Sequence, residues 1–281
     1  MQAVVSDIGF DVVSNTLDGH SANRKFYIQK LCNGEMQQSI PHPYNQGSRI
    51  FLPYDSVHVF KCTYNNFLNK KWFRCPNFDG PGFIEPDVGH IQQLYDYELG
   101  RPLKYAHKLT DKVLHPMPIQ KTNVDLADRF YHESTIDALD YYSENGFPHF
   151  KPTAKYLRII RTWWNIVNCK NPSFGKRTRD PVREPISIDD PGGIQYLEKV
   201  LKWIKKWEEM ENGRCFSSAT FITFKQTTHG LIGVAIYLLE EKGLGYVLLA
   251  FIGSDPIEGR YGWYRQLSGK FLRSASVCCI S

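Results

Sequence analysis

The sequence predicts an α/β protein in which a mainly helical middle section separates two shorter portions. Residues 10–70 alternate between short β-branched runs and helical patterns, in the order strand, helix, strand, helix. Residues 75–87 are dense in Pro and Gly, which is typical of a connector. From residue 88 to residue 241 the apolar residues recur mostly at helical spacing, and a return segment follows.

The first portion begins with a predicted strand over residues 10–17 (FDVVSNTL), which is rich in β-branched side chains and ends at Asp18-Gly19. Ser21 is the expected cap of a helix that continues to Leu31. The other predicted elements of this portion are a strand over residues 49–53 and a helix over residues 55–66.

Four helices are predicted in the middle section from apolar residues three or four positions apart. They cover residues 88–97, 123–145, 153–168 and 193–211. Tyr156, Ile160 and Trp163 share one face of the third helix. Beyond the middle section, residues 219–241 are expected to be mostly helical, and Ser254-Asp255-Pro256 opens the final segment.

Composition and cysteine spacing indicate a globular intracellular protein. The chain has 281 residues, of which 42% are hydrophobic and 22% charged, and its net charge of +5 permits a nucleic-acid partner without requiring one. The seven scattered cysteines include no C-x-x-C pair, which argues against a disulfide framework and a zinc ribbon. No signal peptide or membrane-spanning run is visible in the sequence.

Three acidic stretches have a structural interpretation, and the first two also have a chemical one. Asp18 ends a predicted strand, where its carboxylate could bind a metal, but Asp-Gly is also a common tight turn. In Asp55-x-x-His58-x-x-Lys61 the first two side chains could share a ligand, or Asp55 could simply begin a helix. Asp255-Pro-Ile-Glu258 has the spacing of a capping box.

Two basic stretches could contact a nucleic-acid backbone. Residues 259–281 contain no acidic residue, and the aromatic residues Tyr261, Trp263 and Tyr264 alternate with basic ones. The basic residues of this stretch are Arg260, Arg265, Lys270 and Arg273. A second cluster, in a Pro-flanked loop, consists of Lys176, Arg177, Arg179 and Arg183. A solvated helix face is the alternative for the first stretch.

Several blocks of the sequence, taken in order, resemble the P-element-type DNA transposases, the group often fused to THAP zinc fingers. The closing run SDPIEGRYGWYRQLSG is similar to that family's last signature. The blocks VVSNTLDGHSANRKFY, PYDSVHVFKCTYNN, NVDLADRFYHESTIDAL and TAKYLRIIRTWWNIVNCKNPSFGK precede it in the family's order. The resemblance spans about residues 10–275.

The resemblance implies a partial RNase H-like fold interrupted by a helical GTP-binding insertion domain. The expected division is residues 1–70 and 216–281 for the RNase H-like parts and residues 71–215 for the insertion. It also implies a site of three carboxylates that holds two Mg²⁺ ions about 4 Å apart for cutting and joining DNA. By motif match, Asp18 and Glu258 are the expected metal ligands and catalytic residues.

This chain departs from the family pattern at two places. Only seventeen residues precede Asp18, too few for the strand that carries the family's first Asp, so we expect a truncated chain that is inactive alone. The family's D-x-x-N pair reads Asn165-Ile-Val-Asn168 here, and an amide offers guanine one acceptor where a carboxylate offers two. Asn165, Asn168 and Asp255 are the expected nucleotide contacts, and GTP binding is left open.

Three functions from different classes remain after the sequence analysis. One is a transposase-derived nuclear protein whose ancestral substrate is DNA, with Mg²⁺ as cofactor. Another is a non-catalytic module for DNA or protein binding, and a guanine-nucleotide-binding protein is a third interpretation. A homo-oligomer is compatible with each. The expected DNA contacts are Lys176, Arg177, Arg179, Arg260, Arg265 and Lys270.

Overall fold

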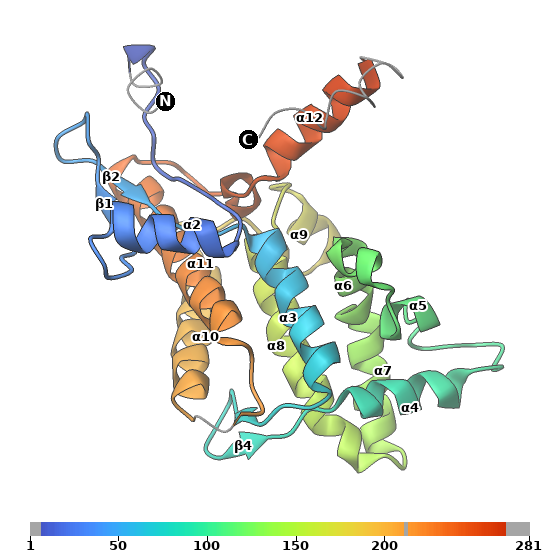
Figure 1. Cartoon of the computed structure of the whole chain (residues 1–281). Helices are drawn as coiled ribbons and strands as arrows, with labels where there is room; N and C mark the ends of the chain where they lie inside the picture. The colour runs from blue at the N-terminus through green and yellow to red at the C-terminus, as the bar shows by residue number, and fades with distance from the viewer. Residues whose placement is uncertain (1–6, 211–212, 268–281) are drawn as a thin grey trace.

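Helices make up most of the described chain (Figure 1). They surround a large apolar core. The computed structural model describes residues 7–210 and 213–267. The α-helices are α2 (Ser21–Lys25), α3 (Ser56–Lys70), α4 (Val88–Glu98), α5 (Asp111–Leu114), α6 (Val124–Phe130), α7 (Glu133–Glu144), α8 (Lys151–Val167), α9 (Phe174–Thr178), α10 (Gly192–Glu209), α11 (Ser218–Ile236) and α12 (Asp255–Leu267). The π and 3-10 turns are η1 (Phe26–Leu31), η2 (Pro118–Thr122), η3 (Pro148–Phe150), η4 (Pro181–Arg183), η5 (Tyr237–Glu241) and η6 (Leu249–Ile252).

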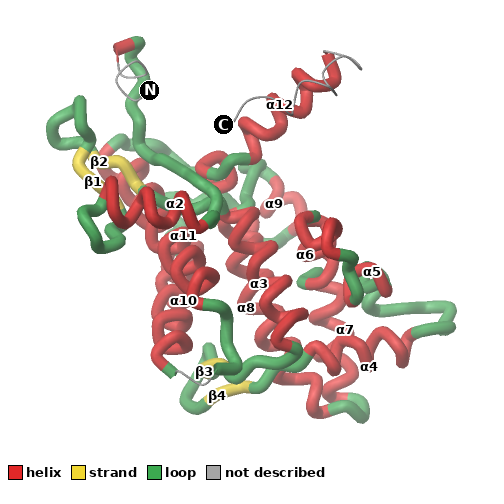
Figure 2. Tube along the Cα trace, viewed as in Figure 1, coloured by secondary structure: helices red, strands yellow, loops and turns green. Residues whose placement is uncertain are grey.

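The strands are short, as Figure 2 shows. β1 (Ser39–Pro41) pairs antiparallel with β2 (Arg49–Phe51), with Ile40 opposite Ile50. β3 (Cys75–Pro76) and β4 (Phe83–Ile84) form a second antiparallel pair. The α/β prediction is therefore confirmed only in part, because helices predominate and the described residues form two small sheets rather than one large one.

The strand predicted over residues 10–17 is an extended segment that pairs at isolated positions. Parallel bridges join Ser14 to Phe51 and Leu17 to Tyr54. The amide of Asp55 donates to the carbonyl of Leu17 at 2.8 Å. This pairing places Asp18, which follows the segment, beside the start of α3.

α11 holds the N-terminal portion against the helical body. The Gln226 amide donates to the carbonyl of Leu52 at 2.9 Å, and the Thr227 hydroxyl donates to the carbonyl of Tyr54 at 3.0 Å. These carbonyls belong to the extended residues after β2, where no neighbouring strand takes them up among the described residues. Gln226 and Thr227 of α11 therefore donate to carbonyls that a neighbouring strand would otherwise bind.

Aromatic rings fill the core between α3 and α8. Phe60 and Trp164 are stacked with their ring centroids 4.2 Å apart. The indole of Trp163 is fully buried, and its N–H donates to the hydroxyl of Thr228 at 3.0 Å. The face predicted from the spacing in residues 153–168 is the buried face of α8.

The single helix predicted over residues 123–145 is wrong, because the structure has two helices there, α6 and α7. His132 is extended, with φ −64° and ψ 145°, and its Nδ1 accepts the Ser134 amide at 3.1 Å. α7 thus has its own cap, and Glu133 in its first turn reaches Arg161 of α8. Apolar spacing did not reveal the break because the repeat continues on both sides of it.

Two smaller differences concern helix caps. The cap expected at Ser21 is supplied by His20, whose Nδ1 accepts the Ala22 amide at 3.3 Å. The capping-box interpretation makes Asp255 the residue before the final helix. The helix includes Asp255, so it starts one position earlier than that interpretation predicts. Within residues 7–210 and 213–267, no helix combines the length and the apolar character that crossing a bilayer requires.

Candidate functional site

A cavity of about 320 Å³ lies where the C-terminal half of α8 meets α6 and α9. Its lining residues are Asp128, Arg161, Trp164, Asn165, Asn168, Cys169, Lys170, Asn171, Phe174 and Arg183. A second hollow of about 350 Å³ adjoins it, because Asp128, Trp164, Asn168 and Lys170 line both. We call the two together the α8 pocket.

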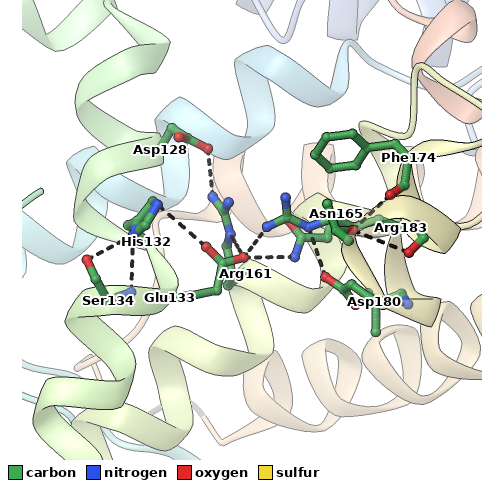
Figure 3. A network of polar contacts seen from close by, with 12 residues as sticks. Asp128, His132, Glu133, Ser134, Arg161, Asn165, Phe174, Asp180 and Arg183 are labelled. Carbon is green, nitrogen blue, oxygen red and sulfur yellow. Dashed lines mark hydrogen bonds and ion pairs between the residues drawn. The ribbon is translucent and has the colours of Figure 1, made fainter.

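An ion-pair network fixes one wall of the α8 pocket (Figure 3). Arg161 is buried and donates from Nε to Glu133 Oε1 at 2.9 Å and from its NH1 group to Asp128 at 2.6 Å. Arg183 donates to the same oxygen of Glu133 and also pairs with Asp180 at 2.9 Å. The guanidinium groups are thus largely neutralised by carboxylates, so this wall suits a neutral polar group better than a bare phosphate.

Glu133 is ionised by its position between the two guanidinium groups. Its burial favours the neutral acid, but the attraction of Arg161 and the hydrogen bonds to the carboxylate outweigh burial and lower the pKa of Glu133 to about 2. The carboxylate therefore stays charged throughout the neutral range and keeps both arginines in place.

The two amides predicted to contact a nucleotide lie together in this pocket. Asn165 Nδ2 donates to Glu133 Oε1 at 3.2 Å, which commits its N–H side to the protein. Its carbonyl oxygen is thereby oriented as an acceptor. Asn168 lies one turn further along, at the end of α8, and its side chain makes no hydrogen bond with any residue that the structure describes. The pair offers acceptors and a free amide donor from one helix face.

Several pocket residues were missed by the sequence analysis. Asp128, Arg161 and Phe174 come from three different helices, so no local spacing connects them. Arg161 was detectable, because a cation on the apolar face of a buried helix requires a carboxylate partner. Which carboxylate would serve could not be known before α7 was placed against α8.

Asp18 has the geometry of a turn residue. Its Oδ1 accepts from the His20 amide at 2.9 Å and from Asn23 Nδ2 at 2.7 Å. The hydrogen bond from the His20 amide lowers the pKa of Asp18, and the nearby His58 adds to the effect. Burial lowers the pKa of His58 in turn. The side chain is ionised and exposed, and it lies close to His58 of α3.

The extended segment before Asp18 meets the segment that leads into α12. The Thr16 hydroxyl donates to the carbonyl of Ile252, and Ser254 Oγ donates to Asp55 Oδ2 at 2.7 Å. Asp55 also caps α3 by accepting the Val57 amide at 3.0 Å, as its acidic-cap interpretation predicted. Residues more than 200 positions apart in the sequence, such as Thr16 and Ile252, therefore share one neighbourhood.

Glu258 and Asp255 belong to α12, but their side chains lie outside the described residues. Their proposed contacts with metal or nucleotide stay predictions. Among the side chains that the structure does describe, no group of three His, Cys, Asp or Glu is arranged to hold a metal ion. Of the two expected Mg²⁺ ligands, only Asp18 has a described side chain. The described side chains therefore form no complete ligand set for Mg²⁺.

The predicted nucleic-acid contacts fall into two groups. Lys176 and Arg177 lie exposed on α9, and Arg179, also exposed, ends that helix with a φ of 54°. Arg183, named with this cluster, is instead an internal partner of Glu133. α12 extends away from the body of the molecule (Figure 1).

α12 exposes aromatic side chains together with a cation. Tyr261, Trp263 and Tyr264 are each more than half exposed, and Arg260 is exposed beside them. The side chain of Arg265, and Lys270 and Arg273 altogether, lie outside the described residues. The aromatic and basic pattern seen in the sequence is therefore present on the surface of this helix.

One family model matches part of this chain, and one solved structure shares its fold. Residues 57–181 match the family model of the TNP-like GTP-binding insertion domain. The fold is that of the chain in the Drosophila P element transposase strand transfer complex, with a TM-score of 0.80 and 17% identity over 96% of this chain and 58% of that one.

Two transposases are similar to this chain in sequence. DNA transposase THAP9 of Homo sapiens is 26% identical over 190 residues, which are 63% of this chain and 19% of that protein. The Transposable element P transposase of Drosophila melanogaster is 19% identical over 269 residues, 94% of this chain and 33% of that protein. The chain is a relative of the P-element-type DNA transposases and spans a third or less of the length of these two proteins.

Proposed function

We propose that the α8 pocket binds a purine nucleotide, with guanine as the preferred base. The observation that carries the proposal is the meeting of Asn165, Asn168 and Lys170 in one cavity next to the ion-pair network of Glu133. The family model that covers this region is described as a GTP-binding insertion domain, which supports the same conclusion.

The side chains of the α8 pocket include the donors, acceptors and positive charge that a purine nucleotide requires. Asn165 presents a carbonyl oxygen that can accept from a ring N–H, and Asn168 can both donate and accept. Lys170 lies where the two hollows join and carries the charge that phosphates need. The arginines hold the wall in shape through Glu133 and are not counted as phosphate ligands.

Titration of the whole chain with a fluorescent GTP analogue tests the proposal. Asn168→Ala is expected to weaken binding about tenfold or more, since it removes groups that only the ligand uses. Gln195→Ala, which removes an exposed amide from α10, is the matched control and should bind as the unaltered chain does. Absence of saturable GTP binding, or equal binding by Asn168→Ala, would refute the proposal.

We further propose that the chain derives from a metal-dependent DNA-cutting and joining enzyme of RNase H-like ancestry and is inactive on its own. The supporting observation is that the Asp18 turn meets the segment before α12. Glu258 belongs to α12. The described side chains do not complete a metal site, so no reaction step is assigned to Mg²⁺. A nuclear location accords with relatives named as DNA transposases.

A strand-transfer assay with the purified chain and Mg²⁺ separates the two interpretations of the DNA-related role. We expect no product, and binding of duplex DNA that falls steeply with salt concentration would then support a non-catalytic DNA-binding module. DNA cleavage that is abolished by Asp18→Ala would show that our inactivity prediction is wrong. Weak binding without salt dependence would count against both DNA interpretations.

A further inference from the structure

A second cavity, separate from the α8 pocket, lies where the β3–β4 hairpin folds over α8 and α10. Its volume is about 230 Å³, and we call it the hairpin pocket. Lys155, Arg158 and Thr162 line it from one face of α8, and Tyr196 and Lys199 line it from α10. This cavity uses residues 155–162 of α8, whereas the α8 pocket uses residues 161–168, and the two cavities share no lining residue.

The hairpin pocket is built into the fold rather than formed by loose side chains. The indoles of Trp203 and Trp207 donate to the carbonyls of Pro76 and Arg74, each at 2.8 Å, and so fix the hairpin to α10. Both tryptophans are buried. The position of the hairpin over the two helices is therefore set by core packing.

An aromatic wall and a set of cations meet in this pocket. The rings of Phe78 and Tyr196 lie 5.5 Å apart, and the ammonium of Lys199 lies 4.2 Å from the centre of the Phe78 ring. Lys199 also pairs with Asp79 at 2.7 Å. Lys155 is exposed, and it has no ion-pair or hydrogen-bond partner among the residues that the structure describes. Lys155 is thus available to a ligand, whereas Lys199 is shared with Asp79 and Arg158 with Asp140.

The size of the pocket limits what it can hold. Cavities for complete small molecules usually measure about 300–1,000 Å³, which is more than this pocket offers. A flat ring against the aromatic wall with a phosphate beside the cations would use both features. Exposed lysines at 202 and 206 continue the positive charge along α10 from Lys199.

We propose that the hairpin pocket binds one nucleotide of a single-stranded nucleic acid, with the base against Phe78 and Tyr196 and the backbone phosphates along Lys155, Lys199 and the lysines of α10. A single strand is favoured over a duplex because only an unpaired, unstacked base can reach the wall. This inference does not depend on the α8 pocket.

Fluorescence anisotropy of labelled oligothymidine with the whole chain tests the proposal. Lys155→Gln/Lys199→Gln should weaken binding about tenfold or more and make the slope of log K against log salt shallower by about 1.4. Lys104→Gln/Lys112→Gln removes the same charge from exposed positions of the 99–114 region and should leave binding unchanged. An abasic oligomer of equal length should bind more weakly, since stacking contributes about 1–3 kcal/mol per base.

Three results would overturn the proposal: equal loss in both double variants, equal binding of the abasic oligomer, or preference for duplex over single strand. Circular dichroism of each variant shows whether it folds, and the abasic comparison needs no variant at all. Because GTP is titrated separately at the α8 pocket, failure here and failure of nucleotide binding there are distinguishable.

Discussion

Gly19 lies where the Asp18 turn touches both α3 and α11. A Cβ at this position would lie 2.9 Å from Thr223 Cγ2 and 3.1 Å from His58 Cδ2. The glycine of the Asp-Gly dipeptide is needed for close packing, since its φ is not in the left-handed region. The sequence identified the turn, but the two helices that make glycine necessary come from distant parts of the chain.

Replacement of this glycine gives the first prediction. Gly19→Ala should lower the free energy of unfolding by about 1–3 kcal/mol, because the added methyl forces Thr223 or His58 to move. Gly245→Ala is the control, since a Cβ there meets nothing within 4 Å. Urea denaturation measures both. Equal stability of the two variants would contradict the packing argument.

Glu133 gives the second prediction, at the ion-pair wall of the α8 pocket. Glu133→Gln should destabilise the chain by about 1–3 kcal/mol, because buried Arg161 loses a charged partner. The pKa of Glu133 is lowered from its ordinary 4.5 to about 2, so its contribution is complete above pH 4.5 and is lost as the pH falls towards 2.

The measurement is the stability difference between the unaltered chain and Glu133→Gln as a function of pH. That difference should be constant above pH 4.5 and shrink below it. A difference that grows as the medium becomes acidic would show that the sign of the linkage is wrong. Glu144→Gln, at an exposed position in the last turn of the same helix, provides a comparison.

At the scale of elements, the break between α6 and α7 decides whether the α8 pocket has its wall. His132→Ala should cost about 1 kcal/mol, because the first turn of α7 loses its cap, and His132→Asn should restore much of it. Both variants are compared by thermal unfolding. If the alanine and asparagine variants are equally stable, the side-chain cap at position 132 does not stabilise the start of α7.

The same histidine makes the cap sensitive to pH. Burial lowers the pKa of His132, so folding favours the neutral imidazole whose Nδ1 can accept a hydrogen bond. Its contribution is therefore present above pH 6.5 and declines as the pH falls below that value. Asparagine does not titrate in this range, so the stability of His132→Asn should vary less between pH 7 and pH 5.

At the scale of the whole molecule, the N-terminal portion and the helical body are joined through α3 and α11. Gln226 and Thr227 of α11 bond to backbone carbonyls after β2, and α3 packs on α6, α8 and α11. We expect one cooperative unfolding transition. Far-UV circular dichroism and tryptophan fluorescence should coincide, and Gly19→Ala should shift both. Two separate transitions would mean that the portions fold independently.

Much of the helical architecture was predictable from the sequence because it depends on local pattern. The amphipathic face of residues 153–168 is the buried face of α8, and the acidic start at Asp55 is a true cap. The pair Asn165 and Asn168 was identified from a resemblance and lies in a pocket. The break at His132 was not predicted because the apolar repeat continues on both sides of it, and the role of Arg183 was not predicted because its partner Glu133 comes from another helix.

The sequence by itself determined where most of the long helices lie, the kinship with P-element-type transposases, and the positions of the chemically interesting amides and carboxylates. Only the tertiary structure decided which of these meet. Helical periodicity and caps are set by residues a few positions apart, whereas a cavity wall requires side chains from several helices at once. Glu133, Arg161 and Arg183 share one network only because α7, α8 and η4 pack together, and no local pattern encodes that packing.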